Sequence, residues 1–199
     1  LVLAANSSQL HTCAIRPGYI MGARCIGLRL EMLRARARSD HFVSARGPAV
    51  ISTVHPKNCA LLHILAAEQA HTAMVGGRPF FSRDFEANVV DMYLECFRQP
   101  ELGLKVVLLP VGVAYLMAWV ADRLDRLMHF LARCVGGCWA SSEDTVDIAA
   151  VGMLWTDIVV SDRAARDMLG YAPLVTRDEC MRDAADWSKK FYAQLRAQR

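Results

Sequence analysis

The sequence has little net charge of either sign, and this excludes one class of partner. Its 23 Lys and Arg residues face 20 Asp and Glu residues, so the formal net charge of the 199-residue chain is only +3. Nucleic-acid-binding proteins draw much of their affinity from clustered Lys and Arg that neutralise phosphates. We therefore expect no nucleic acid partner. The arginines between Arg24 and Arg46 are a local exception, which we interpret as the solvated face of a helix, with a nucleotide or acidic lipid contact as the alternative.

The sequence also lacks an apolar run long enough to span a membrane. Its longest uncharged stretch, Val106 to Ala121, falls short of the ~20 residues that a spanning helix needs and contains Pro110. Beyond this proline the pattern predicts an amphipathic helix, which packs on a core or lies on a membrane surface. Its apolar side is formed by Val113, Leu116, Met117, Val120, Leu124, Leu127 and Leu131, and its polar side by Asp122, Asp125, Arg126, His129 and Arg133.

Cysteine is present, but its pattern indicates neither disulfides nor a metal. The seven cysteines are an odd number and lie mostly in apolar runs, as reduced core cysteines of cytosol-facing proteins do. Cys134 and Cys138 form the only close pair. Their spacer is longer than the two-residue zinc or redox pattern, and no second ligand pair follows it. We therefore expect no metal site.

What the chain does have is enough apolar sequence for one globular unit over residues 1–199, since 54% of its residues are hydrophobic. Strand-like runs alternate with helical runs, which predicts an α/β protein with a partly parallel sheet. The expected strands are 11–17, 49–54, 78–82 and 105–110. The expected helices are a basic helix with the buried stripe Ile26, Leu30 and Leu33, then 58–70, 87–97, 111–133 and a last one from Thr176, with a loop at 134–144.

Local signals mark the ends of several elements. Ser161 is the expected N-cap of a helix that Gly170 ends in a left-handed conformation, and Thr176 with Glu179 predicts a capping box. Tyr171 is expected to fold back on the helix that it follows, and Ala184 and Trp187 to face the core.

Other polar residues receive structural interpretations. We interpret Asn58 as the N-cap of the helix after the second strand, and Asp84 and Glu86 as part of a loop and helix start. His55 and His63 have no Ser or Cys nucleophile at a suitable position, so we interpret both as structural histidines.

Five stretches, taken in order, resemble a known family. They are "LHTCAIRPGYIMG", "ISTVHPKNCALLHILAAE", "GGRPFFSRDFEANVVDMY", "LPVGVAYLMAW" and "RAARDMLGYAPLVTRDECMRDAADW". Their order resembles the C-terminal half of extended short-chain dehydrogenases, above all the 3β-hydroxysteroid dehydrogenase group with the sterol 4-carboxylate 3-dehydrogenases. The resemblance implies the C-terminal part of an extended Rossmann-like, NAD(P)-binding fold, together with a small α/β substrate lobe.

The resemblance also implies a cofactor site. The strand that ends in Pro17, Gly18, Tyr19 and Ile20 resembles the family segment that passes the nicotinamide of NAD or NADP, at the edge of the sheet where α/β proteins bind ligands. Pro17 and Gly18 would let the backbone approach a flat ring, and Tyr19 and Ile20 would wall the pocket. A buried strand with an ordinary turn explains the same residues. Met21 replaces the usual Tyr of the family and Ala23 replaces a frequent Pro, so we expect a looser turn.

Two features that the family needs for hydride transfer are missing. No Gly-rich phosphate turn follows a first strand, and none of the tyrosines is followed four positions later by the Lys that lowers its pKa. By the resemblance, "LVLAANS" would be the tail of the helix that carries this Tyr-Lys pair. We therefore assign no catalytic residue and expect the chain to be inactive in isolation.

The substrate is expected to be apolar. Related nucleotide-sugar enzymes place an Arg for the diphosphate where this chain has Ile51, Ser52 and Thr53. The resemblance therefore implies an NAD(P)-dependent dehydrogenase that oxidises the 3β-hydroxyl of a steroid or sterol. The alternative is a truncated, non-catalytic relative that binds sterol or a membrane surface. A cytoplasmic location, at the surface of the endoplasmic reticulum in the membrane-bound case, and a homodimer complete these expectations.

Overall fold

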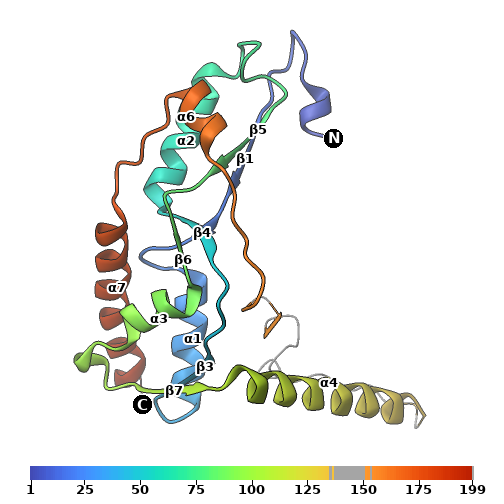
Figure 1. Ribbon diagram of the computed structural model, residues 1–199, viewed down its shortest axis with the longest axis vertical. Coiled ribbons are helices and arrows are strands. Elements are labelled where there is room, and N and C mark those ends of the chain that lie inside the picture. Colours follow the sequence, from blue (N-terminus) through green and yellow to red (C-terminus); the bar gives the residue numbers. More distant parts are fainter. Residues whose placement is uncertain (135, 137–150, 153, 199) are drawn as a thin grey trace.

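The computed structural model describes residues 1–134, 136, 151–152 and 154–198, and it has the expected mixture of helices and strands (Figure 1). Its strands form three small groups. β1 (Ala14–Pro17) pairs in parallel with β5 (Pro79–Ser82), and β3 (His41–Ala45) pairs in parallel with β7 (Lys105–Leu109). Between them, β4 (Ile51–Val54) pairs in parallel with β2 (Tyr19–Ile20) and antiparallel with β6 (Phe85–Ala87). The predicted α/β class is confirmed.

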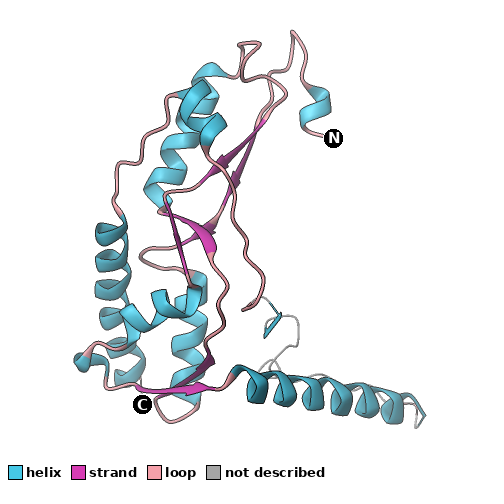
Figure 2. Cartoon of the chain, in the orientation of Figure 1, coloured by secondary structure: helices cyan, strands magenta, loops and turns pink. Residues whose placement is uncertain are grey.

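The helices lie beside these strand groups (Figure 2). Among the described residues they are α1 (Ile26–Ala37), α2 (Pro56–Gln69), α3 (Val89–Phe97), α4 (Val111–Cys134), α6 (Arg163–Leu169) and α7 (Arg177–Ala197), with short 3-10 turns at Leu3–Ala5 and Pro100–Leu102. Each of the strands and helices predicted from the sequence is found within a few residues of its expected position. The loop expected at 134–144 lies largely outside the described residues.

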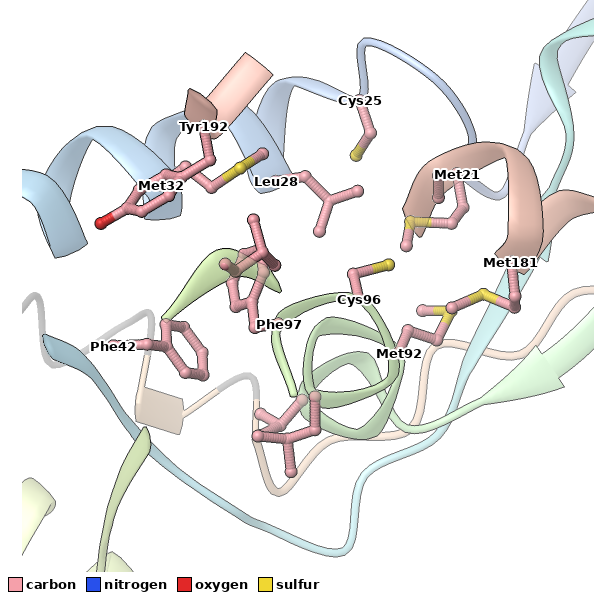
Figure 3. Packing of buried hydrophobic residues seen from close by; sticks show 14 of the residues in the cluster. Met21, Cys25, Leu28, Met32, Phe42, Met92, Cys96, Phe97, Met181 and Tyr192 are labelled. Carbon is pink, nitrogen blue, oxygen red and sulfur yellow. The ribbon is translucent and has the colours of Figure 1, made fainter. Parts of the chain in front are cut away.

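The larger hydrophobic core lies between α1, α3 and α7 (Figure 3). Leu28 and Met32 of α1 meet Phe97 of α3 there, and all three side chains are fully buried. From α7, Ala184 is fully buried and Trp187 packs on the same cluster, as predicted. A second core joins α2 and α6 to β5 through Leu62, Ala66, Val75, Phe80, Ala165, Leu169 and Tyr171.

The predicted burial of α1 is wrong. Ile26 is 74% exposed, and Leu30 and Leu33 are also exposed, whereas the buried residues of this helix are Leu28, Met32 and Ala35. Both triplets follow the i, i+4, i+7 spacing of one helical face. Helical periodicity therefore could not decide between the two faces, and the packing of β3 and α7 on one of them does.

The signals around α6 and α7 are largely confirmed. Gly170 ends α6 with φ 66°, and the N–H of Tyr171 then donates to the carbonyl of Ala165, which folds the buried Tyr171 back on the helix. Thr176 and Glu179 form the predicted capping box. The N-cap of α6 is one residue later than expected, at Asp162, although Ser161 Oγ accepts a hydrogen bond from the N–H of Arg163.

The structure contains two strands, β3 and β6, that the sequence does not predict. β3 was not predicted at all; it follows Ser39 and Asp40, which both have positive φ angles, and it pairs with β7 over five residue pairs. Phe85–Ala87, expected as a loop and helix start, is strand β6. Its pairing with β4 is long-range, so the local charge pattern of Asp84 and Glu86 gave no sign of it.

α4 is amphipathic as predicted, but it does not bury its apolar side among the described residues. It projects away from the rest of the structure (Figure 1), and only Ala114 and Ala118 of this helix are buried. Leu116 is 59% exposed and Leu124 is 56% exposed. Within the described part of the chain, no helix has the length and hydropathy that a membrane crossing requires.

Candidate functional site

A cavity of about 480 Å³ lies where the first strand ends. Of the four residues predicted to bind a cofactor, Gly18, Tyr19 and Ile20 line this cavity, whereas Pro17 lies outside its lining and pairs with Ser82 in the sheet. The remaining lining residues come from the following loop, from α1 and from the start of α2: Gly22, Ala23, Arg24, Cys25, Ile26, Gly27 and Pro56. The structure thus brings three of the four residues to one cavity, and their role in cofactor binding stays a prediction.

Gly18 is required by the change of strand partner. Up to Pro17 the chain pairs with β5, the N–H of Gly18 donates to Ser82 (2.9 Å), and from Tyr19 onward the chain pairs with β4. A Cβ atom at Gly18 would overlap the backbone carbonyl of Ser52 in β4. The close approach that the sequence predicts at Gly18 therefore exists, but the partner is the neighbouring strand.

Tyr19 turns its phenol away from solvent toward α3. Its hydroxyl lies 2.7 Å from the hydroxyl of Tyr93 and 3.4 Å from Cys25 Sγ. Gly27 makes room for this pair, because a Cβ atom there would overlap both hydroxyls. Burial raises the pKa of Tyr19 far above its usual value and raises that of Tyr93 to about 12. Both phenols therefore stay neutral near pH 7, and neither replaces the Lys-activated tyrosine of a dehydrogenase.

Three hydrogen bonds, one with β4 and two with α7, hold the loop after Ile20, so the looser turn expected from Met21 and Ala23 is not found. The fully buried Met21 donates its N–H to the carbonyl of Val54 (3.0 Å), and its own carbonyl accepts from Cys180 Sγ (3.3 Å). The N–H of Ala23 donates to Asp183 Oδ2 (3.0 Å). α7 therefore fixes the loop that lines the cavity.

His55 adds another hydrogen bond between this region and α7. Its Nδ1 accepts the N–H of Lys57 and caps α2, which leaves Nε2 to donate to Asp183 Oδ2 at 3.3 Å. Partial burial would raise the pKa of Asp183, but the hydrogen bonds from Ala23 and His55 outweigh it and hold the pKa below its usual value. His55 is buried, and its contacts agree with the structural role predicted for it. His63 likewise bonds through Nδ1 to the carbonyl of Cys59 (2.8 Å).

The interpretation of Asn58 as an N-cap is wrong, because His55 caps the helix and Asn58 lies fully buried in its first turn. Its Oδ1 accepts from the N–H groups of Leu174 and Val175, both at 2.9 Å. Its Nδ2 donates to the carbonyl of Val175 (2.8 Å) and to Asp84 Oδ2 (2.7 Å). Every hydrogen-bonding position of the amide is thus used: three bonds join α2 to the segment before α7, and the fourth joins it to Asp84, just before β6.

Asp84, next to Asn58, is a second side chain whose hydrogen bonds join several elements, and the sequence does not predict this role. Its Oδ2 also accepts the N–H of His55 (2.7 Å), and its Oδ1 accepts the hydroxyl of Tyr171 (2.6 Å). Burial and the Asp84 carboxylate raise the pKa of Tyr171 above its usual range. The carboxylate therefore ties the segment before β6 to α2 and to the end of α6, which is a structural task.

The described residues contain no cluster of three side chains able to hold a metal ion. The close cysteine pair considered above cannot be compared, because Cys138 lies outside the described residues. Cys25, Cys96 and Cys180 are buried free thiols, and burial raises the pKa of both Cys96 and Cys180 to about 12. The thiols of Cys96 and Cys180 therefore stay protonated and unreactive near neutral pH.

The comparisons with known proteins support the predicted family and fold. The 3-beta hydroxysteroid dehydrogenase/isomerase family matches residues 1–104. The following three are among the solved structures that share the fold. A UDP-galactose 4-epimerase has 11% identity and a TM-score of 0.57, with 96% of this chain and 50% of that chain covered. A UDP-glucuronic acid 4-epimerase from Bacillus cereus, in complex with UDP-glucuronic acid and NAD, has 10% identity and a TM-score of 0.54, with 92% and 47% covered.

The third is RMD from Pseudomonas aeruginosa, complexed with NADPH, with 8% identity, a TM-score of 0.54, and 92% and 49% covered. At these identities the likeness shows the fold alone, and it confirms the predicted Rossmann-like α/β architecture. The chain spans about half the length of these structures. One of them holds NAD and another NADPH, in agreement with the expected cofactor class.

Proposed function

Because the chain belongs to the 3-beta hydroxysteroid dehydrogenase/isomerase family, we propose that it is the substrate side of an NAD(P)-dependent 3β-hydroxysteroid or sterol dehydrogenase. The proposed reaction oxidises a ring hydroxyl to a ketone, with the cofactor taking the hydride. The observation that carries the proposal is the cavity at the end of β1 and β2, lined by Gly18, Tyr19 and Ile20. It lies at the kind of strand end where α/β proteins bind ligands.

The division of the protein is part of this proposal. Residues 1–199 would supply the C-terminal strands of the dinucleotide-binding sheet and the substrate lobe, with the phosphate-binding turn and the Tyr-Lys pair contributed from outside this chain. The high pKa values of Tyr19 and Tyr93 support this division, because neither phenol can exchange a proton readily near pH 7. We expect residues 1–199 alone to have no dehydrogenase activity.

An apolar substrate is favoured over a sugar nucleotide. At the position of the diphosphate-binding Arg of nucleotide-sugar enzymes, Ser52 and Thr53 are buried, and Ile51 pairs with Ala87. These side chains offer no positive charge to a diphosphate. Apart from Arg24, the lining of the cavity is mainly glycine and apolar side chains, which suits a rigid ring system. The proposal therefore names a steroid or sterol as the small-molecule partner.

A direct assay uses the full gene product with NAD⁺ and a 3β-hydroxysteroid, followed by NADH absorbance. Ile20 is 44% exposed and lines the cavity, so Ile20→Trp should fill part of it and weaken steroid binding at least fivefold. Ile64→Trp is the matched control, because Ile64 is 56% exposed and lies on α2 outside the cavity lining. Equal steroid affinity in both variants would place the substrate elsewhere, and no turnover with any 3β-hydroxysteroid would contradict the reaction.

A second candidate, a non-catalytic module for sterol or a membrane surface, is favoured by α4. Its exposed apolar residues include Leu116, Trp119 and Leu124, and an amphipathic helix of this kind can lie in the interface of a bilayer. The protein would then sit peripherally on the cytoplasmic face of the endoplasmic reticulum. Co-sedimentation with phosphatidylcholine vesicles should be lost in the double variant Leu116→Asp/Leu124→Asp. If the wild type stays in the supernatant, the surface contact is wrong. If these residues are instead covered by a second copy of the chain, light scattering should give twice the mass of the monomer.

A further inference from the structure

Arg24 has an unusual backbone and an unusual position. It has φ 63°, in the left-handed region that side chains other than Gly, Asn and Asp rarely adopt. It stands at the turn between Ile20 and α1, and it lines the cavity at the end of the strands. Strained backbone of this kind persists where the surroundings fix it, and it is found preferentially at functional sites.

The surroundings do fix this turn. Ala23 donates its N–H to Asp183, Cys25 donates its N–H to the carbonyl of Gly22 (3.2 Å), and Met21 is bonded to both β4 and α7. Gly22 packs against the ring of His55, which itself bonds to Asp183. Arg24 is therefore presented on a rigid support, and the fold tolerates a strained arginine at this point of the cavity wall.

Among the described residues, the guanidinium of Arg24 has no ion-pair partner. Arg24 is the one charged residue among those that line the cavity, and it is exposed. No hydrogen bond or ion pair joins its guanidinium to another residue in the described part of the chain. The carboxylate of Asp183 lies close to this turn, but it already accepts hydrogen bonds from the N–H of Ala23, the residue before Arg24, and from His55.

We propose that Arg24 binds an anionic oxygen group, such as a carboxylate or a phosphate, on the ligand that occupies this cavity. The inference rests on the proposed function, since it assumes that this cavity holds the steroid or the dinucleotide. A guanidinium matches the planar, two-oxygen geometry of these groups better than any other side chain. Such a group could belong to an anionic steroid or to the cofactor, and the experiment separates these two sources.

The test measures ligand affinity by isothermal titration calorimetry on the full gene product. The steroid probes are 3β-hydroxy-5-androstene-17β-carboxylic acid and its neutral methyl ester, and the cofactor probes are NAD⁺ and NADP⁺. The variants are Arg24→Gln, Arg24→Lys and the control Arg98→Gln, because Arg98 is exposed and lies outside the cavity. Circular dichroism melting checks that each variant is folded.

We expect Arg24→Gln to weaken one anionic probe about tenfold, as the loss of a charge-assisted hydrogen bond does. Arg24→Lys should restore part of this affinity, and Arg98→Gln should change nothing. A loss confined to the steroid acid, with the ester unchanged, identifies the substrate as the source of the anion; a loss confined to NAD⁺ or NADP⁺ identifies the cofactor.

Unchanged affinity for every anionic probe in Arg24→Gln would overturn the inference. The proposed function would then still stand if the ester and the cofactor bind the wild type. Failure of the ester and the cofactors to bind the wild type would instead contradict the proposed function, so the two failures are distinguishable.

Discussion

Asp40 provides the most quantitative test of how this fold is held together. It lies in the turn between α1 and β3 with φ 66°, and it joins the ends of two helices. Its Oδ1 accepts the hydroxyl of Tyr192 (2.6 Å) and lies 3.2 Å from Arg36, and its Oδ2 accepts from Arg196 (3.0 Å). The hydrogen bond from Tyr192, with the hydrogen bond from Arg196 and the charges of Arg196 and Arg36, outweighs partial burial and lowers the pKa of Asp40 from 3.8 to about 2.

The substitution Asp40→Asn isolates the charge. Asn also tolerates the left-handed backbone, and its carbonyl can still accept from Tyr192. Lowering the pKa from 3.8 to about 2 corresponds to about 2.5 kcal/mol of stabilisation by the ionised form. Because the Asp40 side chain remains 23% exposed, water and salt screen its ion pairs, and we expect a loss of about 1 kcal/mol.

Urea unfolding followed by tryptophan fluorescence measures this loss, since Trp187 stacks on Phe191 (4.9 Å) in the same helix as Tyr192. The carboxyl pKa is lower in the folded than in the unfolded protein. Its contribution is therefore complete above about pH 5 and is lost as the pH falls through 4 toward 2. Asp178→Asn is the control, because the Asp178 side chain is 84% exposed and should change stability by less than about 0.5 kcal/mol. Equal stability of Asp40→Asn and wild type at pH 7, or a difference that persists unchanged at pH 2, would refute the reasoning.

Three further substitutions test the attachments around the cavity by urea unfolding. Asn58→Ala should cost about 2 to 4 kcal/mol, because it removes four hydrogen bonds made by a fully buried side chain; a loss below about 1 kcal/mol would contradict this. Gly27→Ala should force the two phenols apart and cost about 1 to 3 kcal/mol, whereas Gly112→Ala, where a Cβ meets open space, should not destabilise. Thr176→Ala removes the cap of α7 and should cost about 1 kcal/mol. An unchanged unfolding midpoint in Thr176→Ala would mean that solvent replaces the cap.

The elements were predictable from sequence where their signals are local. The end of α6 at Gly170 and the start of α7 at Thr176 depend on residues a few positions apart, so the sequence alone identifies them. The strand-helix alternation is equally local. α1 shows the limit of this approach, since two apolar stripes on one helix give the same periodicity, and only tertiary packing selects the buried one.

The polar centres were not predictable because their partners are distant in sequence. Asn is a residue type that is common at N-caps, yet the side chain of Asn58 forms hydrogen bonds with residues 116 and 117 positions away. Asp84 likewise meets Tyr171 across 87 positions. Side chains that satisfy buried backbone groups are selected by the geometry of assembled elements, which no short sequence pattern records.

The candidate site is predictable only in part, because it depends both on a local sequence feature and on a contact between residues far apart in sequence. The Pro17–Gly18 segment is recognisable in the sequence, and the cavity lies beside Gly18, where the extended chain changes its strand partner. The wall of that cavity, however, depends on Ala23 being bonded to Asp183, which is 160 positions away. α7 therefore does more than cover the core, because its first two turns fix the backbone of the loop that presents Arg24. A ligand that contacts this loop should in turn stabilise α7, since binding and the loop-helix contacts favour the same conformation.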